Sequence, residues 1–169
     1  EESNIFKKLT PFKLIMPFGN YYLCPNFFIG ELHEGVHLDW SKVELLIPEI
    51  LKFYSPNAKI VYIANRINSY SIDPQNWVRL EKDYDLLVAS AIIIYNKPSY
   101  INASLEKQFA KQSIKRCLSL NEAVGWVENL KEFMQISERG IDIYENDYTL
   151  LDENIELQNI KFKKIYYKG

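Results

Sequence analysis

Residues 59–74, with the sequence KIVYIANRINSYSIDP, decide the fold that we predict for this chain. Residues 59–64 have the length and the β-branched composition of a buried strand. Residues 65–71 then form a mostly polar loop, and Asp73-Pro74 is typical of an N-cap followed by proline in the first helical turn. A buried strand, a short polar loop and a helix start, in that order, indicate a parallel α/β unit.

The residues before this unit predict an antiparallel hairpin and a helix. Two apolar runs flank Pro25-Asn26, which predicts a β-hairpin over residues 20–33. Asp39 is a suitable N-cap, and apolar residues recur at helical spacing over 40–54. Pro48 lies inside this helix, and we expect a kink there because proline removes one helix hydrogen bond.

The residues after this unit continue the alternation of helices and strands. Apolar periodicity and continuous apolar runs predict helices at 74–84, 100–111 and 120–133, and strands at 86–95 and 115–118. Ser119 and Glu122 have the spacing of a capping box for the last helix. The whole order predicts an α/β fold with a mostly parallel sheet, an antiparallel N-terminal hairpin and about four helices.

A length of 169 residues fits one domain with lead-in and trailing segments. Prolines and a glycine punctuate residues 1–19, which we interpret as an N-terminal lead-in. Residues 20–134 hold the regular elements of the domain. Residues 135–169 differ in composition, and their apolar content predicts a C-terminal extension with short strands or a docking arm.

The overall composition excludes some classes of function. A formal net charge of −2 is too small for strong attraction to nucleic acid or to an acidic membrane. No apolar stretch reaches the ~20 residues that a transmembrane helix needs. The first residues lack a basic region followed by an apolar core, so we expect a cytoplasmic protein. Cys24 and Cys117 lie in apolar runs, which favours two reduced, buried thiols over a disulfide.

Four segments resemble the STAS (SpoIIAA-like) domain family, and more closely its small Bacteroidetes-type and Sec14-like members. They are residues 31–35, 62–71, 105–109 and 119–126, of which 62–71 is the most specific. The resemblance extends over residues 20–134 and implies the STAS fold.

The resemblance also implies a regulatory serine in the loop after the second core strand, open to phosphorylation by a partner kinase. The family pattern there is Asp-Ser-Ser/Thr-Gly, whereas residues 68–73 read Asn-Ser-Tyr-Ser-Ile-Asp. Ser69 and Ser71 therefore match the regulatory serine by position only, and the glycine is missing. The related Sec14-like lipid carriers share a similar architecture and imply a different function, that of a carrier.

The polar loop is the candidate binding or regulatory site, and its members are Asn65, Arg66, Asn68, Ser69, Tyr70 and Ser71. The loop follows a parallel strand, where open α/β sheets place ligands, and precedes a helix N-terminus, which favours anions. Arg66 has the geometry to hold a phosphate with two hydrogen bonds. We predict an exposed recognition surface. The alternative is that these side chains only close the turn and cap the helix.

Two other groups of polar residues carry weaker signals. Two histidines and three nearby acids are compatible with a metal site: His33, His37, Glu31, Glu34 and Asp39. Because there is no third histidine and no cysteine cluster, we favour a solvated turn. Glu106 and Lys107 are interpreted as a solvated, mixed-charge helix face.

No motif of a nucleotide-binding or hydrolytic enzyme is present in the sequence. We therefore expect a non-enzymatic regulatory or protein–protein interaction module without a cofactor, whose partner is another protein or a second copy of the chain. The alternative is a carrier of a small apolar or lipid-like ligand, held between the sheet and aromatic-rich helices. A structural dimer without a ligand is the third hypothesis.

Overall fold

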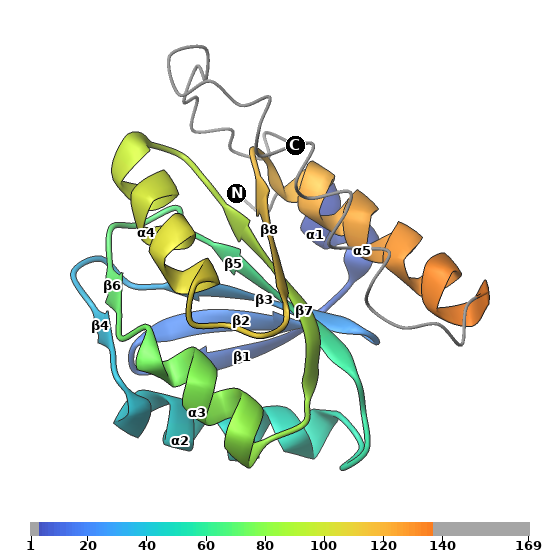
Figure 1. The fold of residues 1–169 in the computed structure, drawn as a ribbon. Helices are drawn as coiled ribbons and strands as arrows, with labels where there is room; N and C mark the ends of the chain where they lie inside the picture. The colour runs from blue at the N-terminus through green and yellow to red at the C-terminus, as the bar shows by residue number, and fades with distance from the viewer. Residues whose placement is uncertain (1–3, 137–169) are drawn as a thin grey trace.

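A six-stranded sheet forms the centre of the computed structural model, which describes residues 4–136 and the side chains of residues 4–130 (Figure 1). The strands, in their spatial order, are β1 (Phe12–Met16), β2 (Gly19–Leu23), β3 (Phe27–Leu32), β5 (Ile60–Asn65), β7 (Leu87–Ile93) and β8 (Ser113–Cys117). A separate two-stranded sheet consists of β4 (His37–Leu38) and β6 (Ser71–Ile72). The helices are α1 (Asn4–Leu9), α2 (Trp40–Phe53), α3 (Gln75–Asp83), α4 (Lys97–Lys107) and α5 (Leu120–Ile136).

The sheet combines an antiparallel and a parallel part. Strands β1, β2 and β3 pair antiparallel, whereas β3, β5, β7 and β8 pair parallel. Ile63 of β5 lies opposite Ile29 of β3 on one side and Ala91 of β7 on the other. The predicted mostly parallel sheet with an antiparallel N-terminal hairpin is therefore confirmed.

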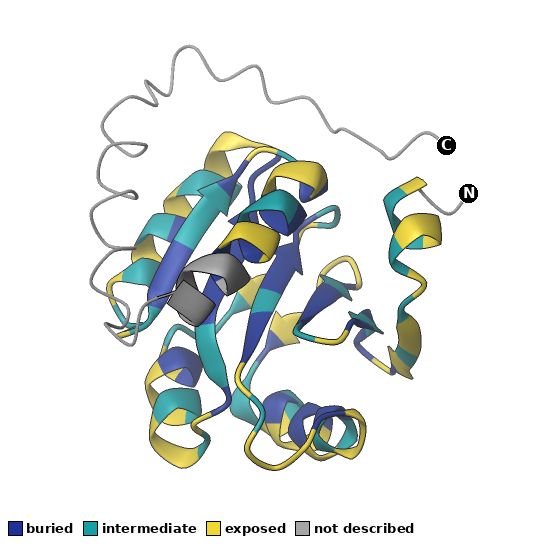
Figure 2. Cartoon of the chain, turned by 90° about the vertical axis from the view of Figure 1, so that its right-hand side faces the viewer, coloured by how far each residue is buried: buried dark blue, intermediate teal, exposed yellow. Residues whose placement is uncertain are grey.

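Helices cover both faces of the sheet. Figure 1 shows α2, α3 and α4 on one face and α1 with α5 on the other. Neighbouring residues of β5 show the same division, because Ile63 packs with α5 whereas Ala64 packs with Trp77 of α3 and Ala103 of α4. Figure 2 shows buried residues along the strands and exposed ones on the outer helix faces. Since both faces are covered, the central strands are apolar throughout rather than at alternate positions.

Two helices begin at the side-chain caps that the sequence predicted. Asp39 Oδ1 accepts a hydrogen bond from Lys42 N at 3.2 Å, which begins α2, and the helix continues through Pro48. At α5, Ser119 Oγ accepts from Glu122 N at 3.1 Å while Glu122 Oε2 accepts from Leu118 N at 2.8 Å. The predicted capping box is thus present.

Several features differ from the sequence-based expectations. The N-cap of α3 is Pro74 rather than Asp73, without a side-chain capping bond, and α4 ends at Lys107 rather than near residue 111. The lead-in contains α1 and β1, and β1 belongs to the central sheet. The loop after β5 contains β6, which pairs with β4. Helix α4 begins at Lys97 rather than near residue 100, because Asn96 Oδ1 caps it by accepting from Ser99 N at 2.8 Å.

Both thiols are free and buried, as predicted. Cys24 and Cys117 belong to the core cluster between the sheet and α5. Burial raises the pKa of the Cys117 thiol above its ordinary value. The strands or docking arm predicted for the C-terminal extension lie, from residue 137 onward, outside the described residues.

Candidate functional site at the carboxyl end of the sheet

Asn65 ends β5 and joins three neighbouring strands. Its amide Nδ2 donates to Glu31 Oε1 at 2.6 Å, and its Oδ1 accepts from Tyr95 Oη at 2.6 Å. These partners lie in β3 and just after β7. The side chain of Asn65 is only 1% exposed, so its function is to satisfy polar groups inside the protein. Burial raises the pKa of Glu31, although hydrogen bonds from Asn65 and Tyr22 oppose the shift.

Arg66 points into the protein and forms a buried ion pair. Its Nη2 donates to Glu106 Oε1 of α4, and the side chains of Arg66 and Glu106 are 6% and 2% exposed. Trp77 Nε1 of α3 donates to the other oxygen, Glu106 Oε2, at 3.0 Å. The pair therefore ties the end of β5 to α3 and α4. The prediction that Glu106 lies on a solvated helix face is wrong.

The middle of the loop is half-buried. Asn68 Nδ2 donates to the carbonyl oxygen of Leu32 at 2.7 Å, which fixes the loop against the end of β3. The ring of Tyr70 lies under the Arg66 guanidinium, 5.4 Å from the ring centroid. Burial raises the pKa of the Tyr70 hydroxyl, against the opposing effect of Arg66.

The last part of the loop is exposed and held by residues 34–38. Ser69 N donates to Glu34 Oε2 at 2.7 Å, and Ser71 N donates to the Val36 carbonyl at 2.9 Å. The Ser71 hydroxyl forms a hydrogen bond with His37 Nδ1 at 2.7 Å. These contacts and the β4–β6 pairing fix an exposed polar surface. We define the serine surface as Ser69, Ser71, Glu34 and His37.

The loop predicted as one exposed surface thus divides into two parts. The prediction of exposure is wrong for Asn65 and Arg66, which are buried because each has a charged or polar partner inside the protein. Asn68 and Tyr70 are half-buried. Ser69 and Ser71 are exposed. The predicted reach of Arg66 to a phosphate is also wrong, since its guanidinium is occupied by Glu106.

The three acids considered for a metal site have other partners. Glu31 binds the Asn65 amide, Glu34 binds the Ser69 backbone, and Asp39 caps α2. Among residues 4–136, no three histidine, cysteine, aspartate or glutamate side chains are grouped as metal ligands.

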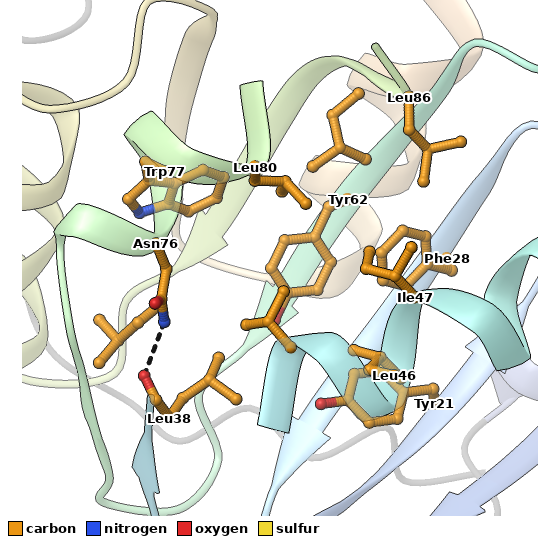
Figure 3. Close-up of a pocket in the computed structure, with 13 residues that line it drawn as sticks. Tyr21, Phe28, Leu38, Leu46, Ile47, Tyr62, Asn76, Trp77, Leu80 and Leu86 are labelled. Atoms are coloured by element: carbon orange, nitrogen blue, oxygen red, sulfur yellow. Dashed lines mark hydrogen bonds between the residues drawn. The ribbon is translucent and has the colours of Figure 1, made fainter. Parts of the chain in front are cut away.

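An apolar cavity lies beside the loop, between the sheet and helices α2 and α3 (Figure 3). Its volume is about 60 Å³, and its walls are almost entirely aliphatic and aromatic side chains. The lining residues include Tyr21, Phe28, Tyr62, Trp77 and Leu80. The sequence predicted a pocket between sheet and helices but not its residues, because they come from eight separate elements.

Within residues 4–136, no helix combines the length and apolarity that crossing a membrane requires. The chain matches no protein-family model, no curated protein and no solved structure.

Proposed function

We propose that the chain is a non-enzymatic interaction module that recognises a partner protein through the serine surface. The observation that supports this proposal is that the exposed segment around Ser69 and Ser71 is held by hydrogen bonds on two sides. Asn68 anchors it to β3 from inside, while Glu34 and Val36 hold its backbone from outside. Exposed polar side chains on a backbone held in this way form a preorganised surface for recognition.

The local charges favour Ser71 over Ser69 as a site of regulation by phosphorylation. A phosphate on Ser71 would lie beside the His37 imidazole, whose ring N–H donates well to phosphate oxygens. A phosphate on Ser69 would lie close to the Glu34 carboxylate, which repels it. This assignment replaces the role first expected of Arg66. It also agrees with the resemblance to STAS domains, whose regulatory serine occupies this loop.

Photo-crosslinking tests the interaction proposal. A photoreactive residue is placed at position 69, at position 71 or, as a matched control, at position 55, and the chain is expressed in its source cells. Ser55 is also exposed, but it precedes β5 and therefore lies at the opposite end of the sheet. We expect the same partner from positions 69 and 71 and not from 55. Equal capture from all three positions, or capture from none, contradicts the proposal.

A second candidate function is a carrier of a small apolar ligand, and the cavity beside the loop favours it. The cavity lies between the sheet and two helices, and all but a few atoms of its wall are apolar. Ligand sites of this kind combine apolar walls with a few polar groups. A volume of about 60 Å³ suits a small molecule rather than an acyl chain.

A further inference from the structure

We infer that the cavity between the sheet and helices α2 and α3 is a binding site for a small, flat apolar molecule with one hydrogen-bond acceptor, which the hydroxyl of Tyr21 holds. This inference rests on the second proposed function and gives it a ligand class and an anchoring residue. It is independent of the serine surface.

The polar anchor is the hydroxyl of Tyr21. Tyr21 is 1% exposed, lines the cavity, and its Oη makes no hydrogen bond with any residue in the described range 4–136. A buried hydroxyl without a partner costs free energy, so such groups almost always meet a partner. Figure 3 shows the hydroxyl end of Tyr21 directed toward the side of the cavity where Leu38 lies. Burial raises the pKa of Tyr21, which keeps its proton available for donation.

Two other polar side chains of the wall, Asn76 and Trp77, already donate to partners within the protein. Asn76 Nδ2 donates to the carbonyl oxygen of Leu38 at 2.7 Å, as the dashed line in Figure 3 marks. The Trp77 indole N–H donates to Glu106, away from the cavity. Tyr62 also brings a hydroxyl to the wall, but among the described residues the wall hydroxyl that is buried without a partner is that of Tyr21, so a ligand that offers one acceptor is paired with Tyr21.

Aromatic rings give the cavity walls a flat shape. Tyr62 stacks on Phe28 with ring centroids 4.9 Å apart, and it lies 6.4 Å from the Trp77 ring. Leu46 and Ile47 of α2 also line the cavity. Rings prefer offset-stacked or edge-on neighbours, so a single planar ring suits these walls better than a branched chain.

The volume sets the size of the ligand. A water-sized group needs about 10–15 Å³ of such space, so 60 Å³ holds about four to six non-hydrogen atoms. Six-membered aromatic rings are at this limit. Ile72 and Leu80 in the wall are only half-buried, so the cavity approaches solvent along the α3 side.

The test uses pyridine and benzene, two rings of equal size of which only pyridine has an acceptor. Each probe is titrated into the full chain while methyl NMR signals of Leu38 and Leu46 report on the cavity. We expect both probes to shift these signals in the parent protein. The Tyr21→Phe variant keeps the ring but loses the hydroxyl. In this variant the ratio of pyridine to benzene affinity is expected to fall about three- to tenfold, because one neutral hydrogen bond contributes about that factor to affinity.

Two further variants serve as controls. Tyr84→Phe removes the hydroxyl of a half-buried tyrosine outside this cavity and is expected to leave the ratio unchanged. Leu80→Trp fills the cavity from α3 and is expected to abolish both interactions. If both probes bind but the ratio in Tyr21→Phe equals that of the parent, the inferred anchor is wrong while the carrier function stands. If neither probe shifts the cavity signals of the parent, the inference and the carrier function both fail.

Discussion

Arg66 and Glu106 illustrate at the scale of single residues why the candidate site was only partly predictable. The carboxylate of Glu106 receives hydrogen bonds from Arg66 and from Trp77, and almost no surface of the pair reaches water. The two charged residues are 40 positions apart. Helical spacing gives no information about a partner at that distance, so each residue was interpreted alone, as an exposed charge. The exposure of Ser69 and Ser71 was predictable because it depends on the local turn.

The buried ion pair leads to a prediction about stability. Glu106→Ala leaves the Arg66 charge buried without its partner, and we expect the free energy of unfolding to fall by about 3–5 kcal/mol. Combining Glu106→Leu with Arg66→Met removes both charges and is expected to recover most of that loss. Urea denaturation measures all three proteins.

The matched control is Glu49→Ala, which breaks the exposed pair between Glu49 and Lys52. Exposed pairs contribute about 0–1 kcal/mol, so this variant is expected to change little. A loss from Glu106→Ala no larger than that from Glu49→Ala would show that the Arg66 charge is accommodated without its partner.

At the scale of elements, predictability depended on whether an element carries its own signal. Helix α5 was predictable because its capping box lies next to an apolar stripe, and β5 because its β-branched run is long enough. Strands β4 and β6 have two residues each, and such short pairings have no periodicity. Strand β1 has five residues and lies between Pro11 and Pro17. Because prolines are frequent in loops, these two suggested a loop rather than a strand.

Two glycines, one in a strand and one in a helix, give a matched prediction at this scale. A Cβ at Gly30 of β3 would lie 2.9 Å from Tyr62 Oη and 3.0 Å from Tyr21 Cε1. We expect Gly30→Ala to destabilise the protein by about 1–3 kcal/mol, because both rings line the cavity and must shift. A Cβ at Gly125 of α5 meets nothing within 4 Å, so Gly125→Ala is expected to stabilise the helix by about 0.5–1 kcal/mol.

Thermal unfolding and urea denaturation measure the two glycine variants side by side. Methyl NMR of Gly30→Ala further tests whether the cavity signals change, as the displaced tyrosine rings require. An unchanged stability for Gly30→Ala would mean that the rings above β3 have room to move, and would weaken the picture of a fixed cavity wall.

At the scale of the whole molecule, the sheet topology was predictable because alternating strands and helices leave few arrangements. The residues of the cavity wall were not predictable, because they come from strands β2, β3, β5 and β7, from helices α2 and α3, and from the β4–β6 pair. Whether these residues come together depends on how the helices pack on the sheet, and the spacing of residues along the chain does not predict that packing.

The two thiols test whether this sheet opens as one unit. Cys24 follows β2 and Cys117 ends β8, so several strands separate them, yet both belong to the core cluster beneath α5. They are 1% and 0% exposed, and burial raises the pKa of Cys117, so attack by the native thiolate is suppressed. We therefore expect both to react with a thiol reagent only after global unfolding, with the same opening free energy.

The Cys24→Ala and Cys117→Ala variants leave one thiol each, and labelling followed by intact mass over a urea series gives the opening free energy at each position. Both values are expected to equal the free energy of unfolding from urea denaturation of the same variant, and to fall with the same urea dependence. Faster, urea-independent labelling of Cys24 would show that the N-terminal hairpin opens by itself. The antiparallel and parallel parts of the sheet would then be separate folding units, and the cavity, whose wall includes β2, would be open to ligands without unfolding of the core.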